Sequence, residues 1–224
     1  MSVLPLLHLC DSLFPTGAFA HSDGLEWATD ARLLVQADQL GDWMDACLDE
    51  TLAHCDGRAV WLSWQAHTDR DRARLVSINA EVHALKPSAV ARQASRAMGA
   101  RLVKTWTLLY QPVDLQHLLT ELDVDRFITL PGAFGVVAAS AGIAPRTAVD
   151  GFIYTRLAAC ASAAMRLMPI GQHDAHRVLA SRLRRADAVV DAIASAPDRP
   201  SSFAPLLDIA SMSHQYVHSR LFRS

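Results

Sequence analysis

Lysine is almost absent from this chain of 224 residues: of its 21 positively charged lysine and arginine side chains, only Lys86 and Lys104 are lysines. Aromatic residues are also few, at 7 % of the sequence, and isoleucine and valine are scarce beside alanine and leucine. Apolar residues still make up 51 % of the chain, which is enough for one substantial core. Because alanine and leucine favour helices while β-branched residues favour strands, the composition indicates a helical protein.

Closely spaced cysteine pairs are missing as well. The four cysteines, Cys10, Cys47, Cys55 and Cys160, are scattered, and there is no C-x-x-C motif. The sequence does not open with the charged, apolar and small-residue regions of a secretory signal peptide. We therefore expect a reduced, cytoplasmic protein with four free thiols.

A strong positive charge is the next absence. The formal net charge is −2 at pH 7, which argues against binding that depends on neutralising the phosphates of a nucleic acid. Residues 1–60 contain ten acids and two bases, whereas the remainder contains thirteen acids and nineteen bases. This asymmetry reflects either a composition bias of the source genome or an acidic face and an arginine-bearing face that meet different partners.

One uncharged segment, residues 127–145, is long enough to be considered as a membrane span. Pro131, Gly132, Gly135 and Gly142 interrupt it, and small residues dominate it. A buried core segment is the better prediction, and we expect no membrane partner.

Apolar residues recur at steps of three and four in two long segments. One stripe consists of Val90, Ala94, Met98, Leu102, Trp106 and Leu109, and the other of Val149, Ile153, Leu157, Cys160, Ala164 and Met168. Each stripe covers one face of a helix of about five to six turns. Pro169 and Gly171 are expected to end the second helix.

Asp23 and Glu26 resemble a capping box at the start of a further helix that carries Trp27, Ala31 and Leu34. No stretch shows the sustained alternation of a half-buried strand. The sequence thus predicts an all-α protein: a single domain over residues 1–224, built as a bundle of roughly eight to ten helices.

The segment Phe14–Ser22 contains a glycine and hydroxyl side chains, which raises the question of a phosphate-binding loop. It lacks the G-x-x-x-x-G-K-[ST] pattern and follows no predicted strand. A turn between helices, followed by an N-cap at Ser22 or Asp23, explains the same residues.

Three histidine or cysteine groupings could contact a metal ion. His173 and His176 are three residues apart, His214 and His218 are four apart and could share a helix face, and Cys47, His54 and Cys55 form a looser cluster. None has four ligands at close spacing, so surface or hydrogen-bonded histidines are the simpler interpretation. We therefore predict no metal site; the weak candidate ligands are His173, His176, His214 and His218.

Nothing in the sequence indicates a catalytic nucleophile. There is no G-x-S-x-G elbow, and Cys160 lies on the apolar face of its predicted helix, where it acts as a small hydrophobic residue. We expect neither catalysis nor a cofactor. Arginines flank the segment 169–174, and they form either a solvated helix face or a surface for an acidic partner; they are Arg166, Arg177, Arg182, Arg184 and Arg185.

The carboxyl-terminal segment, Ser202–Ser224, is unusually apolar for a chain end. It carries Leu206, Leu207, Ile209 and Met212 and finishes with Arg220, Leu221, Phe222, Arg223 and Ser224. Exposing Leu221 and Phe222 to water costs roughly 2–3 kcal/mol each if they could be buried. Such an end is either docked on its own domain or kept for a partner.

This ending closely resembles that of the UreF family of urease accessory proteins. Two internal segments resemble the family as well: FPTGAFAHSDGLE at Phe14–Glu26 and RLMPIGQHD at Arg166–Asp174. The chain departs from the family at Ser213 and Gln215, where an arginine and an acid are common. It also has Leu130 before Pro131, where many relatives have a histidine suited to nickel.

The resemblance implies an all-helical homodimer without chemistry of its own. Such a scaffold binds the accessory protein UreD (also called UreH), recruits the nickel-carrying GTPase UreG, couples its nucleotide state to nickel release and acts on apo-urease. Residues 202–224 are then the partner-binding helix and tail, with Arg220 as polar anchor and Leu221 and Phe222 as apolar plugs beside Arg223 and Ser224.

The resemblance also implies that the Phe14–Ser22 segment, with Phe19 and Ser22, contributes to the partner-binding surface near the tail. Two rival hypotheses remain. One is a metallochaperone that itself carries nickel through its histidine pairs. The other is a small helical enzyme that uses the Phe14–Ser22 loop.

Overall fold

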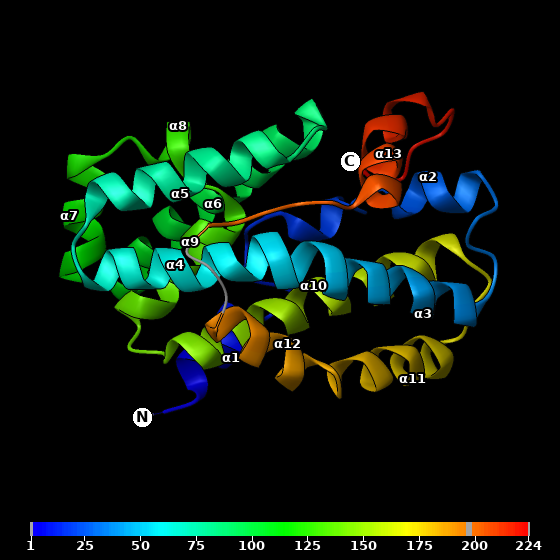
Figure 1. The fold of residues 1–224 in the computed structure, drawn as a ribbon, viewed down its shortest axis with the longest axis horizontal. Coiled ribbons are helices and arrows are strands. Elements are labelled where there is room, and N and C mark those ends of the chain that lie inside the picture. Colours follow the sequence, from blue (N-terminus) through cyan, green and yellow to red (C-terminus); the bar gives the residue numbers. More distant parts are fainter. Residues whose placement is uncertain (1, 196–198, 224) are drawn as a thin grey trace.

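The computed structural model describes residues 2–195 and 199–223, and within these ranges it contains helices and no strand (Figure 1). The helices are α1 (Leu4–Leu9), α2 (Leu25–Asp30), α3 (Ala37–Ala46), α4 (Gly57–Thr68), α5 (Arg72–Leu85), α6 (Ala89–Tyr110), α7 (Val113–Glu121), α8 (Val124–Phe127), α9 (Leu130–Ser140), α10 (Pro145–Leu167), α11 (Gln172–Leu183), α12 (Ala186–Ala194) and α13 (Pro205–Ser213). Shorter or irregular turns are the 3₁₀ segments η1 (Ala18–Ala20) and η3 (His214–Tyr216) and the π-helical η2 (Cys47–Asp56). The prediction of an all-α fold is confirmed.

The helices α3, η2 and α4 form one uninterrupted rod. The residues at both junctions, Ala46, Cys47, Asp56 and Gly57, keep right-handed helical dihedrals, so the chain changes only its winding. The ten central residues are wound as a π-helix, a rare form that often marks functional segments. Counting this rod once, the described part of the chain has nine helices of seven residues or more, within the predicted eight to ten.

The two long helices predicted from apolar stripes are both present. Ser88 caps α6, its Oγ accepting a hydrogen bond from the backbone N–H of Ala91 at 3.3 Å. The α6 stripe is buried in its middle but exposed at both ends, Val90 and Leu109. Helix α10 ends at Leu167, immediately before the turn that contains Pro169 and Gly171.

Helix α9 forms the centre of the core and lies against α4 and α6. Thr129 caps it, and the buried Asn79 of α5 holds that cap: its Oδ1 accepts hydrogen bonds from the Thr129 backbone N–H at 2.8 Å and the Thr129 hydroxyl at 2.7 Å. Gly135 lets the backbone of α4 approach closely at Val60. Of the predicted core segment 127–145, residues 131–138 are all buried, whereas Gly142 and Ala144 near its end are exposed. Among the described residues, no helix combines the length and hydropathy needed to cross a membrane.

The predicted capping box of α2 is wrong. Helix α2 begins at Leu25, after Asp23 and Gly24, which both have left-handed backbone conformations. It ends at Asp30, so it carries Trp27, while Ala31 and Leu34 follow it. The Glu26 carboxylate does not return to the helix start but contacts the carboxyl-terminal segment, and the Asp23 carboxylate pairs with Arg156. Tertiary partners for both acids replace the local cap.

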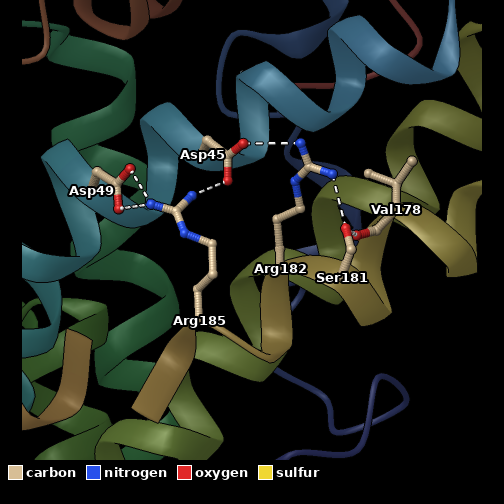
Figure 2. A network of polar contacts seen from close by, with 6 residues as sticks. All are labelled: Asp45, Asp49, Val178, Ser181, Arg182 and Arg185. Atoms are coloured by element: carbon tan, nitrogen blue, oxygen red, sulfur yellow. Dashed lines mark hydrogen bonds and ion pairs between the residues drawn. The ribbon is translucent and has the colours of Figure 1, made fainter. Parts of the chain in front are cut away.

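The acidic and arginine-rich parts of the chain meet within the fold (Figure 2). Arg182 at the end of α11 donates a hydrogen bond to Asp45 of α3 at 2.9 Å. Arg185 contacts Asp45 and also both carboxylate oxygens of Asp49, at 2.8 and 3.0 Å. These two arginines are therefore paired with acids of the same chain, although the Arg185 side chain is still 47 % exposed.

The close contact of α9 with α4 gives a stability prediction. Gly135→Ala should lower the free energy of unfolding by about 1–3 kcal/mol, because the new methyl group would overlap the carbonyl oxygen of Val60 in a packed core. Gly171→Ala is the matched control, since its methyl group would meet its nearest atom, Asp174 Oδ2, at 3.8 Å. Urea denaturation followed by circular dichroism measures both. Equal stabilities of the two variants would contradict the packing described here.

Candidate partner-binding site at the carboxyl-terminal tail

Helix α13 packs on α2 at one edge of the bundle (Figure 1). Its buried side chains are Leu207 and Ala210. Gly24 permits this contact, because a Cβ atom there would lie 2.9 Å from both the Ala210 Cβ and the Ser211 backbone nitrogen. Leu206, Ile209 and Met212 occupy the outer side of α13 and are exposed to solvent.

After α13 the chain turns back over α2 and the Phe14–Ser22 loop. The turn begins with η3, in which the His214 side chain is buried against α2. Its Nε2 lies 2.7 Å from Oε2 of Glu26, and both side chains are about 95 % buried (3 % and 5 % exposed). This pair connects residues 188 positions apart in the sequence.

The backbone of the tail binds the same carboxylate. The N–H of Leu221 donates to Oε1 of Glu26 at 2.5 Å, and the N–H of Phe222 donates to Oε2 at 3.2 Å. One residue later, the N–H of Arg223 donates to the carbonyl of Ala20 at 2.8 Å. The tail is thus docked on its own chain at three successive backbone positions.

One side chain of the tail is buried, and its neighbours are exposed to solvent. Phe222 is 4 % exposed, and the Arg166 guanidinium lies 4.4 Å from the centroid of its ring. Leu221 is 54 % exposed, and Arg220 and Arg223 are also exposed. Phe222 is therefore part of the core in this structure rather than an exposed plug. Ser224, named with the tail from sequence, lies outside the described residues.

The Phe14–Ser22 loop contacts the tail through the carbonyl of Ala20, which accepts the hydrogen bond from the Arg223 N–H. Phe14 is buried in the core, and Phe19 is largely exposed. Arg101 donates a hydrogen bond to the carbonyl of Thr16 at 2.7 Å, and the Oγ of Ser22 accepts one from the backbone N–H of Glu26 at 3.4 Å. Ser22 is buried, so Phe19 is the exposed member of the two loop residues proposed for partner binding.

We define the tail surface as the exposed residues that α13, the tail and the loop bring to this part of the molecule. Its members are Phe19, Leu206, Ile209, Met212, Arg220 and Leu221. Neighbouring Phe203 and Tyr216 are exposed too. Exposed apolar groups with an arginine beside them are typical of protein–protein interfaces.

The four candidate histidines are spread over two parts of the molecule. His173 and His176 are exposed on α11, His214 lies beside Glu26, and His218 lies in a bend after η3. His214 and His218 therefore do not share a helix face, because α13 ends before both. Within residues 2–195 and 199–223, no group of three or more histidine, cysteine or acidic side chains is arranged to hold a metal ion.

The four cysteines are free thiols, and burial keeps them protonated. Desolvation raises the pKa of Cys10 to about 11 and those of Cys55 and Cys160 to about 12. The pKa of Cys47 is also raised well above its usual value, by burial and then by the neighbouring Cys160. Since the thiolate is the form that binds metals and reacts, these thiols are poor ligands and nucleophiles.

Cys47 and Cys160 line a cavity of about 150 Å³ between the core and α13. The cavity also contains Lys86, one of the two lysines, whose Nζ lies 2.9 and 3.1 Å from the two carboxylate oxygens of Asp56. Burial alone would lower the pKa of Lys86, but the carboxylate of Asp56 outweighs that effect and raises it. Lys86 stays charged and acts as an ion-pair partner rather than a nucleophile.

Sequence reasoning missed the roles of Glu26 and His214 in holding the tail. Glu26 had been assigned to a local cap, and His214 to a possible metal pair. Because these two residues are far apart in the sequence, their spacing does not predict that they pair. Only the return of the chain over α2 brings them into contact.

The structure thus defines an all-helical protein with an exposed apolar surface at its carboxyl-terminal end. The sequence model of the UreF family matches residues 34–183, more than half of the chain. The chain therefore belongs to the UreF family, whose members are urease accessory proteins. The matched range includes the Arg166–Asp174 motif, whereas the Phe14–Glu26 segment and the tail lie outside it.

Burial of the thiols leads to a prediction on their reactivity. At pH 8, iodoacetamide should modify Cys10 in the folded protein at least about 100-fold more slowly than in urea, because a pKa raised from 9.0 to about 11 reduces the thiolate fraction by that factor. Cys55 and Cys160 should react more slowly still. Peptide mapping by mass spectrometry measures each site. A rapidly labelled cysteine in folded protein would contradict this assignment.

Proposed function

We propose that this chain is a scaffold for urease activation that performs no reaction itself. In this proposal it binds a UreD/UreH-type accessory protein, recruits a UreG-type GTPase and brings both to apo-urease. Membership of the UreF family supports the general role. The observation that carries the specific proposal is the tail surface, whose apolar residues are exposed although the chain end itself is firmly docked.

Within the tail surface we assign the polar anchor to Arg220. Its side chain is exposed, and the neighbouring Leu221 N–H is fixed by Glu26. An arginine held beside apolar groups is favoured at desolvated interfaces because its guanidinium is weakly hydrated and donates several hydrogen bonds. Leu221 and Phe19 supply apolar contact area, while the buried Phe222 packs in the interior next to the tail surface.

Nickel is the cargo of the assembly in this proposal, and the GTPase carries it. The scaffold couples the nucleotide state of the GTPase to nickel release and helps open the path to the urease active site. The rival hypothesis, a nickel carrier that uses its own histidine pairs, has less support. His214 is engaged by Glu26, and its presumed partner His218 lies beyond the helix.

The proposed scaffold acts as a homodimer. A second exposed apolar surface supports this, formed by Leu4 and Leu7 of α1 and by Leu108 near the end of α6. The two helices are joined by a hydrogen bond of 2.6 Å between His8 Nδ1 and the Tyr110 hydroxyl. A single patch used by both copies is the usual arrangement of a twofold dimer.

Replacing the proposed anchor tests the partner interface. Arg220→Ala should weaken binding to a UreD/UreH-type protein by about 2–4 kcal/mol, or roughly 30-fold or more in Kd, as for a central interface residue. Arg126→Ala is the matched control, because Arg126 is an exposed arginine on α8, outside the tail surface. Biolayer interferometry with purified proteins measures both. Unchanged affinity of Arg220→Ala would remove the anchor role, and a sub-micromolar nickel site found by calorimetry in this chain would favour the nickel carrier.

Light scattering tests the dimer. The wild-type protein at tens of micromolar should have twice the mass of the chain, and Leu7→Asp should shift it toward the monomer, because a charge in an apolar interface is left desolvated and unpaired. Leu13→Asp, at another exposed leucine near the amino terminus, serves as the control for added charge. A monomeric wild type would refute the homodimer.

A further inference from the structure

Glu26 is the point where the carboxyl-terminal segment is attached to the rest of the molecule. Its buried carboxylate receives three hydrogen bonds from that segment: from the ring of His214 and from the backbone N–H groups of Leu221 and Phe222. Hydrogen bonds to an ionised acceptor are shorter and stronger than those between neutral groups. A buried carboxylate also requires such donors, because desolvation without them is costly.

The two-point attachment of the backbone fixes the direction of the tail. The N–H groups of consecutive residues, Leu221 and Phe222, bind the two oxygens of one carboxylate. This arrangement sets which side chain faces inward. Phe222 enters the interior beneath Arg166, and Leu221 and Arg220 remain exposed.

His214 supplies the third bond and orients the carboxylate. It lies where α13 gives way to η3, so its contact with Glu26 also determines where the chain turns back. Oε2 of Glu26 accepts hydrogen bonds from the His214 ring and the Phe222 N–H, while Oε1 accepts one from the Leu221 N–H. Loss of the ring would leave the carboxylate free to rotate away from the tail.

We infer that Glu26, oriented by His214, is the positioning residue of the tail: it holds Phe222 inward and thereby presents Arg220 and Leu221 to the partner. The part of this inference that concerns the partner rests on the function proposed above, whereas the attachment of the tail does not. We call the four residues Glu26, His214, Leu221 and Phe222 the tail latch.

The hydrogen bonds of the tail latch are made to Glu26 of α2, although the Phe222 side chain itself is part of the core. The centre of the core is α9 with α4 and α6, whereas α13 packs mainly on α2, with a smaller contact to α6, and the tail binds α2 and the Phe14–Ser22 loop. Opening of the latch is therefore expected to be a local event that leaves the bundle folded. Regions that open locally become susceptible to proteases at a rate set by the population of the open form.

Limited trypsin digestion under native conditions tests the latch. Trypsin cleaves after arginine, and the bond between Arg220 and Leu221 contains the N–H that Glu26 holds. Glu26→Ala should accelerate cleavage at this bond by at least about tenfold, measured by intact mass, because two backbone N–H groups lose their acceptor. Cleavage after Arg70, in the exposed turn between α4 and α5, is the internal reference and should not accelerate.

Three further variants separate positioning from general stability. His214→Gln keeps an N–H donor for the carboxylate and should cleave nearly as slowly as wild type, whereas His214→Phe should resemble Glu26→Ala. Glu121→Ala, which removes a surface carboxylate bound to Arg72, should leave cleavage at Arg220 unchanged. Equal rates in wild type and Glu26→Ala overturn the latch, as does a parallel increase at Arg70, which would mean that Glu26 supports the whole fold.

Binding of a UreD/UreH-type protein to the same variants distinguishes the two proposals. If both are right, Glu26→Ala lowers affinity together with faster cleavage, and Arg220→Ala lowers affinity as well. If Glu26→Ala is cleaved faster but both variants bind with wild-type affinity, the latch is supported and the proposed interface is refuted. Weaker binding of Arg220→Ala, with neither cleavage nor binding altered in Glu26→Ala, would refute the latch alone.

Discussion

The burial of a single carboxylate connects the two ends of this chain. Glu26 is removed from water by the packing of α13 on α2, and its charge is satisfied by a histidine and two backbone N–H groups from the last part of the sequence. Because an unpaired buried charge is so unfavourable, the acid and its donors are mutually dependent. In the inference above, the inward phenylalanine and the exposed Arg220 and Leu221 take their positions from this contact, whereas the apolar residues of α13 are placed by its packing on α2.

The remainder of the molecule provides the rigid support that this arrangement needs. Helix α9 lies at the centre, and small residues such as Gly135 allow its neighbours to approach closely. Arginines then connect elements that are distant in the sequence. Arg182 and Arg185 join α11 and the start of α12 to the rod of α3 and η2 (Figure 2). Arg101 and Arg166 donate hydrogen bonds to carbonyl groups of the Phe14–Ser22 loop. Much of the charge asymmetry is therefore used inside the chain.

In the proposed role, this chain presents surfaces to partners rather than a reactive centre, and its side chains are compatible with that role. The thiols are buried and protonated, and Lys86 is neutralised by Asp56. Exposed apolar side chains lie on α13 and the tail, and also on α1 and near the end of α6. In the proposed assembly, the nickel chemistry belongs to the partners, and this chain determines where they meet.

The sequence by itself determined the helical class, the long helices α6 and α10, the burial of most of the segment 127–145 and the family resemblance. These features depend on periodicity, helix-ending residues and local motifs, which act over a few turns of chain. It also drew attention to the tail, because Leu221 and Phe222 are unusual at a chain end.

Only the tertiary structure decided what each of those residues does. The spacing of Asp23 and Glu26 indicated a local cap, but both acids bind distant partners instead. The spacing of His214 and His218 indicated a shared helix face, but α13 ends before both residues and His214 pairs with Glu26. Which of Leu221 and Phe222 faces the solvent depends on how their two backbone N–H groups bind the oxygens of Glu26, contacts across 195 and 196 residues. Sequence spacing describes neighbours along a helix, whereas a buried charge selects its donors from whatever the fold brings within hydrogen-bonding distance.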